Sequence, residues 1–250
     1  MSSIRKIIKT ILPLEIKELY ILKRKKSNFK KKTVKETFDL IAKDNFWSSG
    51  ESVSGPGSEL KHTKVLITEL EKLFEIHSVS KLLDLPCGDF NWMQNVDLSK
   101  VNYLGGDIVK DIIEENKMKF KSENIKFEVM DIITSDLGRQ DVVLSRDCLV
   151  HFSYNNIVKT IKNLKRSKST YVLMTTFPEI TKNKDIISGE WRPLNFDIYP
   201  FYFPKPVVLI NENYQGKERY KSKSMALWKI SDLKIPLRLR MYCVLYRIFN

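Results

Sequence analysis

Three aspartates stand where apolar runs of the sequence end. Asp84 closes the run KLLD, Asp107 closes NYLGGD 23 residues later, and Asp131 follows IKFEVM. Parallel strands end at one edge of a sheet, and an acidic residue at a spacing of ~20 residues there meets a nucleoside ribose. A single strand-end aspartate more often caps a helix or forms a turn, but three in register favour a ligand. We predict a nucleoside site, with Asp107 on the ribose hydroxyls and Asp131 with Ile132 on an adenine.

The loop after Asp84 decides whether that nucleoside carries phosphates. A pyrophosphate site needs a glycine-rich loop whose N–H groups approach the phosphates. Here Pro86 and Phe90 stand where that fingerprint has glycine, only Gly88 remains, and proline has no N–H to offer. A ligand without phosphates fits better. S-adenosylmethionine is such a ligand, because its amino-acid end can be held by a loop carbonyl and a carboxylate.

A third group of ionisable residues lies in SRDCLVHF, directly after the fourth predicted strand, and comprises Arg146, Asp147 and His151. An alcohol is a poor nucleophile until its proton leaves, so methyl transfer to a hydroxyl needs a base. His151 titrates near neutrality, and we predict that it is the base, with Asp147 either orienting it or acting itself. A buried structural histidine is the alternative reading of His151. The acids also allow a metal, but no ligand spacing demands one.

The elements that must position these residues alternate along the chain. We predict strands at 81–85, 102–108, 125–132, 140–148, 170–177, 207–214 and 224–230, and helices at 34–44, 59–76, 109–120 and 153–167. This order predicts an α/β fold with a mainly parallel sheet, and the last two strands form an antiparallel hairpin at its edge. We expect Ser58 and Ser153 to cap helices. A weak helix is expected after the first loop, and His62 and His77 are expected on a helix surface.

Two loops are long enough to be functional. NFWSSGESVSGPGSEL, residues 45–60, sets Phe46 and Trp47 among glycines and serines, and we expect it to fold over a ligand. SGEWRPLNFDIYPFYFPKP, residues 188–206, is rich in proline and aromatic residues and would wall off a substrate. Its aromatic rings can stack on sugars, and Arg192 can pair with a phosphate or carboxylate. A packed surface loop is the alternative.

Several of these segments together resemble one group of proteins. The motifs are LLDLPCGDFNWM, NFWSSGESVSGPGS, SRDCLVHFSYNNI, MTTFP, SGEWRPLNF and KSKSMALWKI, spread over residues 46–230. They look like a group of class I S-adenosylmethionine-dependent methyltransferases from bacteria and large algal viruses, associated with surface-glycan genes. The first and third motifs are fairly specific to that group, whereas class I members share the strand-end acids.

The resemblance implies a Rossmann-like methyltransferase fold with seven strands and helices on both faces. It implies that S-adenosylmethionine is bound at its methionine part by Asp84, Pro86, Cys87 and Gly88. The ribose would be bound by Asp107 and Ile108, and the adenine by Asp131 and Ile132. Arg146, Trp47, Ser54 and Gly55 would surround the cofactor. Arg146, Asp147 and His151 would form the catalytic set. The implied reaction is methyl transfer to a hydroxyl of a sugar or of a capsule or lipopolysaccharide precursor.

Two other functions stay open at this point. One is methyl transfer to another small polar acceptor, such as a phosphorylated or amine-bearing glycan decoration. The other is a catalytically silent, membrane-tethered binding module that keeps the fold without the chemistry. A nucleic-acid methyltransferase is disfavoured, because no Asn-Pro-Pro-type motif follows the fourth strand.

The net charge of +13 is confined to the ends of the chain. Residues 1–35 hold 12 Lys and Arg against 2 Glu, a net of +10, and residues 232–250 hold 4 against 1 Asp, a net of +3. The remainder, residues 36–231, is therefore neutral, which is a poor fit to a basic nucleic-acid channel. We predict a basic arm at 1–35, a methyltransferase domain at 36–231 and a tail at 232–250. Residues 1–32 would either contact an anionic membrane or form a solvated, partly ordered extension.

The three cysteines, Cys87, Cys148 and Cys243, are odd in number and far apart. They predict neither a disulfide framework nor a zinc site, and they favour a reducing compartment. No apolar run approaches the ~18–20 residues of a membrane span. We therefore expect a cytoplasmic protein, peripheral to the inner face of the membrane at most, and the sequence leaves the oligomeric state open.

Overall fold

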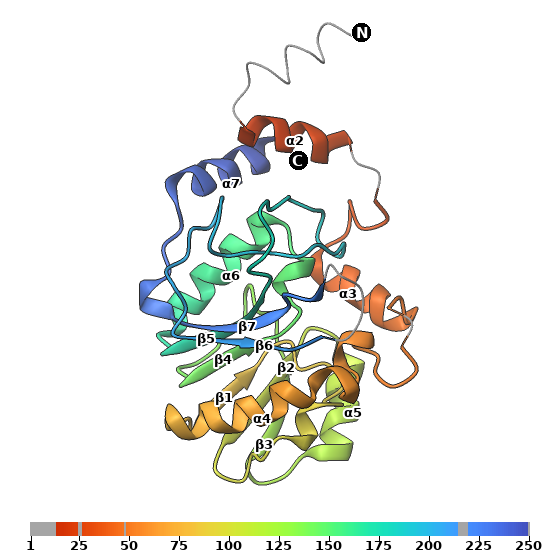
Figure 1. The fold of residues 1–250 in the computed structure, drawn as a ribbon. Coiled ribbons are helices and arrows are strands. Elements are labelled where there is room, and N and C mark those ends of the chain that lie inside the picture. Colours follow the sequence, from red (N-terminus) through yellow and green to blue (C-terminus); the bar gives the residue numbers. More distant parts are fainter. Residues whose placement is uncertain (1–13, 25–26, 48, 215–219, 250) are drawn as a thin grey trace, which may run out of the picture.

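A seven-stranded sheet forms the centre of the computed structural model, which describes residues 14–24, 27–47, 49–214 and 220–249 (Figure 1). The strands are β1 (Lys81–Asp84), β2 (Asn102–Asp107), β3 (Ile125–Val129), β4 (Val142–Ser145), β5 (Tyr171–Thr176), β6 (Val208–Asn211) and β7 (Ser224–Lys229). Their order is β3-β2-β1-β4-β5-β7-β6. The first five are parallel, and β7 lies antiparallel between β5 and β6. The predicted mainly parallel sheet with an antiparallel edge hairpin is confirmed.

Helices cover both faces of this sheet. They are α2 (Leu14–Arg24), α3 (Val34–Lys43), α4 (Leu60–Ile76), α5 (Lys110–Phe120), α6 (Tyr154–Ser167) and α7 (Leu237–Phe249). One core cluster joins α4 and α5 to the sheet side chains of one face, and the other joins α6, α3, α2 and α7 to the opposite face. Successive strand residues point to opposite faces, so Leu82 enters the first cluster and Leu83 the second.

Helix starts follow local hydrogen bonding. Ser153 caps α6 as predicted, because its side chain accepts the N–H of Asn156. The predicted cap at Ser58 is wrong: α4 begins at Leu60, and Ser58 instead closes a short 3₁₀ turn, Pro56–Ser58. The weak helix expected after the first loop is only the 3₁₀ turn Met93–Asn95.

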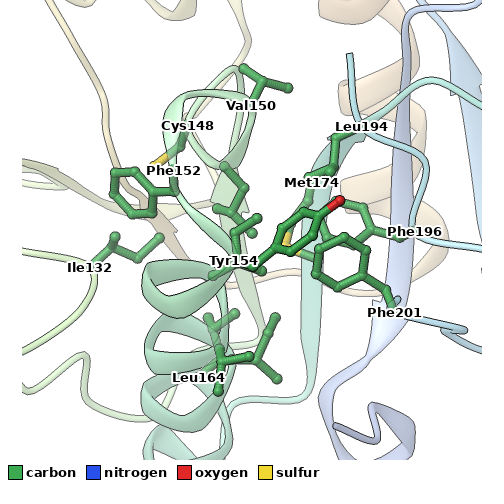
Figure 2. Packing of buried hydrophobic residues seen from close by; sticks show 14 of the residues in the cluster. Ile132, Cys148, Val150, Phe152, Tyr154, Leu164, Met174, Leu194, Phe196 and Phe201 are labelled. Atoms are coloured by element: carbon green, nitrogen blue, oxygen red, sulfur yellow. The ribbon is translucent and has the colours of Figure 1, made fainter. Parts of the chain in front are cut away.

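The core around α6 takes in the loop that follows β5. Figure 2 shows Tyr154 of α6 beside Met174 of the sheet and Phe201 of the loop. The rings of Tyr154 and Phe201 meet edge to face, with centroids 5.3 Å apart. Leu194 and Phe196 of the same loop are fully buried. The apolar side chains Leu194, Phe196, Phe201 and Phe203 of the predicted substrate loop therefore belong to the core, and their packing holds this loop in place.

Helices α2 and α7, the first and the last described helix, pack against each other at one end of the molecule (Figure 1). Leu19 and Leu22 of α2 and Tyr242 of α7 are buried in the core cluster of that face. The predicted tail thus contains a packed helix. Residues 1–13, which belong to the predicted basic arm, lie outside the described residues. In the described part of the chain, no helix is both long and apolar enough to span a bilayer.

Candidate functional site

A cavity opens at the carboxyl ends of the parallel strands, and two buried aspartates line it. Asp84 accepts a hydrogen bond from the hydroxyl of Tyr103 at 2.9 Å. Asp107 accepts the N–H of Gly88 at 3.2 Å and that of Val109 at 2.9 Å. Burial raises the pKa of Asp84 to about 7 and the pKa of Asp107 to about 6. Two carboxyls held in low dielectric favour a ligand that brings positive charge and hydrogen-bond donors.

The same cavity has an apolar wall. Pro86, Cys87, Ile108 and Ile132 line it as predicted, together with Met130 and with Val34, Phe38 and Ile41 of α3. A flat aromatic ring can be sandwiched between such side chains. The contribution of α3 was not foreseen, although the helix itself was predicted. Its apolar stripe covers the cavity as well as the core.

Asp131 does not line the cavity. Its carboxylate accepts the N–H of Ile133 and the hydroxyl of Thr134, both at 2.9 Å, in the turn after β3. This is the turn-forming use that a strand-end aspartate commonly has. The predicted contact of Asp131 with an adenine stays a prediction, whereas its neighbour Ile132 faces the cavity.

Residues 49–58 form a loop over the cavity, and hydrogen bonds to Asp89 fix the position of this loop. The Asp89 carboxylate accepts the hydroxyl of Ser52 and the N–H of Val53 at 2.9 Å, and the hydroxyl of Ser54 at 3.3 Å. The two loops meet so closely that a Cβ on Gly88 would lie 2.0 Å from the Ser54 hydroxyl. Asp89 was not among the predicted site residues. The predicted closing loop is thus tied to the loop after β1.

Trp47 and His151 lie side by side in the wall of the cavity. Their ring centroids are 5.0 Å apart, and the ring of Phe38 stands edge-on to His151 at 6.4 Å. Nδ1 of His151 is 3.1 Å from the main-chain oxygen of Glu190. A carbonyl can only accept, so Nδ1 carries the proton and Nε2 is the basic atom. The Glu190 carbonyl, and not Asp147, therefore orients the ring.

Burial changes the titration of His151. It lowers the pKa of the imidazole to about 4, against the raising effect of Asp147 and of the Glu190 hydrogen bond. The prediction that His151 titrates near neutrality is therefore wrong, because the aromatic rings of Trp47 and Phe38 exclude water from it. At pH 7 the ring is neutral and ready to accept a proton.

Four charged side chains form a network beside His151. Arg146 donates to Glu212 at 2.6 Å and to the main-chain oxygen of Gly57 at 2.8 Å. Lys223 lies 2.5 Å from Asp147 and 3.4 Å from Glu212. Burial would raise the pKa of Asp147, but Lys223 and Arg146 hold it below its ordinary value. Two cations and two anions leave the network neutral. Arg146, predicted to act on both cofactor and substrate, is bound within it.

Glu212 and Lys223 were missed by sequence reasoning. Glu212 follows β6 and Lys223 precedes β7, and both are almost fully buried. A charged residue on each side of the loop that joins the two apolar strands was the available signal. Only the pairing of β5 with β7 shows that this hairpin end meets Asp147.

A second cavity shares four residues with the first, namely Trp47, Ser54, Asp147 and His151. Its other walls are Gly55, Pro56, Gly57, Phe177, Trp191, Tyr214, Tyr220 and Lys223. Aromatic rings therefore surround a small group of polar side chains in this cavity. The predicted substrate loop contributes Trp191, while Arg192 is buried and donates to the main-chain oxygens of Leu149 and Phe152. The predicted pairing of Arg192 with a substrate anion is wrong for this reason.

The two remaining histidines differ from one another. His62 was expected on the surface but is buried, with its ring stacked on Tyr214 at a centroid distance of 4.1 Å. His77 is partly exposed at the end of α4, as expected. His62 thus supports the Tyr214 wall of the second cavity without lining it.

Neither a protein-family model nor a curated protein sequence matches the chain. Solved structures do match it. One is the magnesium protoporphyrin IX methyltransferase of Synechocystis PCC 6803 with bound SAH, with a TM-score of 0.52 and 11% identity over 78% of this chain and 96% of that one. Another is a SAM-dependent methyltransferase of Leishmania major, with a TM-score of 0.57 and 15% identity over 76% of this chain and 83% of that one. The predicted fold, the Rossmann-like fold of class I methyltransferases, is confirmed.

Proposed function

We propose that the protein transfers a methyl group from S-adenosylmethionine to a hydroxyl of a neutral glycan acceptor, such as a sugar or a capsule or lipopolysaccharide precursor. One observation carries the proposal. The cavity with the two buried aspartates and the cavity with the aromatic walls meet at His151 and Asp147. A donor and an acceptor held in these two cavities would face each other beside a neutral histidine whose Nε2 is free of a proton.

The first cavity suits S-adenosylmethionine, which would supply a reactive methyl group on a sulfonium. Asp84 would bind the ammonium of the amino-acid end, and Asp107 would accept hydrogen bonds from the two ribose hydroxyls. The apolar wall at Ile132 would pack on the adenine. Bound positive charge would also offset two carboxyls whose pKa values are raised by burial. A dinucleotide would instead bring phosphates toward these acids.

His151 would take the proton of the acceptor. As the new carbon–oxygen bond forms and the carbon–sulfur bond breaks, the acceptor oxygen becomes positive and its proton strongly acidic. A base with a pKa of about 4 can then remove it, so the low value is compatible with the role. Asp147 is ionised and bound to Lys223, and it would hold the acceptor hydroxyl. Arg146 is a positioning residue that ties the closing loop, through Gly57, to the sheet.

The second cavity favours a neutral acceptor. Its aromatic walls offer faces on which sugar rings pack. Among its described lining residues, Lys223 is the one fixed cation, and Asp147 and Glu212 already neutralise it. A phosphorylated acceptor would find no unpaired positive charge among those described residues. A silent binding module would not need a base with an exposed lone pair between the two cavities, so we favour the enzyme.

The test is an acceptor screen with methyl-tritiated S-adenosylmethionine. Neutral glycosides, their amino-sugar counterparts and their phosphate esters are offered in parallel, and the bond that carries the label is identified by mass spectrometry. We expect label as a methyl ether on a neutral glycoside. Label on nitrogen alone would mean that the acceptor group is an amine and not a hydroxyl. Tight binding of S-adenosylhomocysteine without transfer to any acceptor would support the binding module.

A further inference from the structure

Helix α7 has two apolar faces, and only one of them is packed. Leu239, Tyr242 and Cys243 are buried against the body of the protein. On the opposite face Leu237, Met241, Val244 and Ile248 are 71%, 57%, 57% and 69% exposed. Their spacing of four, three and four residues places all four on one stripe of an α-helix. A helix on the surface of a globular protein ordinarily has one such stripe, and a second, exposed stripe is typical of an interaction surface.

The charged residues of α7 itself are all positive. Arg238, Arg240 and Arg247 lie on α7, and its sequence contains no acidic residue. Arg240 and Arg247 flank the stripe on one side and Arg238 on the other. A second copy of the helix laid on the first would bring six arginines together with no counter-charge. The occupant must therefore offer apolar material and negative charge at once.

A cleft where α2, α6 and α7 meet adds two further cationic side chains, Lys30 and Lys159, beside Arg247. Lys30, Lys159 and Arg247 line it, with Asn155 and Tyr246, and its described lining contains no acid. Asn155 is buried, yet its side-chain oxygen has no hydrogen-bond partner among the described residues. Because the two ends of an amide are interchangeable by rotation, Asn155 can turn its NH₂ toward an anion. Arg247 belongs both to this cleft and to the edge of the stripe.

We propose that this end of the molecule docks on an anionic phospholipid surface, with the α7 stripe in the interface and a lipid phosphate in the cleft of Lys30, Lys159 and Arg247. An apolar helical face flanked by arginines is the arrangement that binds such surfaces. The location agrees with the charge of the sequence, because α2, which packs against α7 (Figure 1), lies within the segment 1–35, whose formal net charge is +10. The proposal is independent of which acceptor the protein methylates.

A pair of labelled variants tests the apolar contact. All three native cysteines are buried, so an environment-sensitive dye will report on an added one. Met241→Cys lies on the stripe, and Met118→Cys is the control, since Met118 is 78% exposed on α5 at the opposite end of the molecule (Figure 1). With vesicles of phosphatidylcholine and phosphatidylglycerol we expect a blue shift of the dye on Met241→Cys and none on Met118→Cys. Vesicles of phosphatidylcholine alone should shift neither.

The charged contact is tested by co-sedimentation with the same vesicles. Removing one cation near the surface should lower partitioning about 5-fold, as a contribution of ~1 kcal/mol per charge implies. Lys159→Ala with Arg247→Ala should therefore lower it about 30-fold. Val244→Ser with Ile248→Ser should also release the protein, whereas Ile76→Ser on α4 should not. Circular dichroism and thermal melting confirm that each variant is folded.

Four results would overturn the proposal. Slow dye labelling of Met241→Cys without vesicles would mean that another part of the chain, such as residues 1–13, covers the stripe. Concentration-dependent dimers abolished by Val244→Ser with Ile248→Ser would assign the stripe to a second copy. Equal binding to neutral and anionic vesicles would remove the role of the cations. Inorganic phosphate bound in the cleft, without any partitioning to vesicles, would leave a free anion as the ligand.

Discussion

Trp47 and His151 lie ring against ring, with centroids 5.0 Å apart and planes tilted by 35°. One belongs to the loop after α3 and the other to the 3₁₀ turn after β4. Their contact brings the closing loop onto the residue that separates the two cavities. It also removes water from the imidazole, which explains why burial is the largest influence on the pKa of His151.

The first prediction concerns the pH dependence of catalysis. Because the pKa of His151 is lowered to about 4, its basic form is complete well below neutrality. With S-adenosylmethionine and acceptor both saturating, so that the ligand already occupies Asp84 and Asp107, the kcat of the wild-type protein should be flat from about pH 6 to pH 8, and should fall only as pH approaches about 4. Initial rates in constant-ionic-strength buffers measure this profile. A rate that instead rises with pH around a midpoint of about 6.5, the ordinary pKa of histidine, would show that water reaches the ring.

A second prediction is that Asp84→Asn stabilises the protein at high pH. The pKa of Asp84 is raised from about 3.8 when unfolded to about 7 when folded, so stability is complete at low pH and is lost as pH rises toward 7. Asparagine can still accept the hydrogen bond of Tyr103 without the buried charge. We expect a gain of roughly 2–4 kcal/mol at about pH 8, vanishing below about pH 4.

Urea denaturation of both proteins across this pH range measures the difference. The same substitution should weaken binding of S-adenosylhomocysteine, because the ammonium loses its carboxylate. Equal stabilities at the alkaline end of the range would show that Asp84 is solvated and not poised for a cationic ligand.

Asp107→Ala is the third prediction. This substitution removes the carboxylate that would accept hydrogen bonds from two ribose hydroxyls. The loss should cost about 1.5–3 kcal/mol of binding free energy, or roughly 10- to 150-fold in affinity for S-adenosylhomocysteine. Calorimetric titration measures this loss. Asp136→Ala, at an exposed turn beyond β3, is the control and should bind as the wild type does. An unchanged affinity in Asp107→Ala would remove the ribose assignment.

The fourth prediction concerns the anchor of the closing loop. Asp89→Ala deprives the Val53 N–H and the Ser52 hydroxyl of their acceptor. Amide hydrogen exchange over residues 49–58 should accelerate, and S-adenosylhomocysteine should bind more weakly while β1 stays protected. Asp97→Ala removes a comparable turn contact, to the N–H of Ser99, in an exposed loop and should leave both unchanged. Unaltered exchange in Asp89→Ala would mean that other contacts hold the loop.

The fold and half of the site were predictable because their signals are local. Alternating apolar runs determine the strands, and a polar residue where a run ends determines which side chains reach the carboxyl edge of the sheet. Asp84, Asp107 and Ile132 were found in this way, and all three line the cavity. Asp131 has the same local signal but serves its own turn, which the sequence pattern does not distinguish.

The rest of the site depends on contacts between distant segments. The environment of His151 is made by Trp47 and Phe38, which lie far earlier in the chain. The network around Arg146 needs the hairpin of β6 and β7 to return beside β5. His62 looked exposed on its own helix, and it is buried because Tyr214 stacks on it. The pattern of residues within one helix or strand does not reveal contacts with such distant segments.

The central claim is that His151 serves methyl transfer between the two cavities, and single turnovers of His151→Ala test it most directly. Enzyme saturated with methyl-tritiated S-adenosylmethionine is mixed with a neutral glycoside found in the screen, and the labelled ether is followed in time. We predict a rate ~10²–10⁴-fold below wild type, with unchanged affinity for S-adenosylhomocysteine and a lost low-pH limb. A full rate in His151→Ala, with the wild-type pH profile, would contradict the account and leave Asp147 as the base.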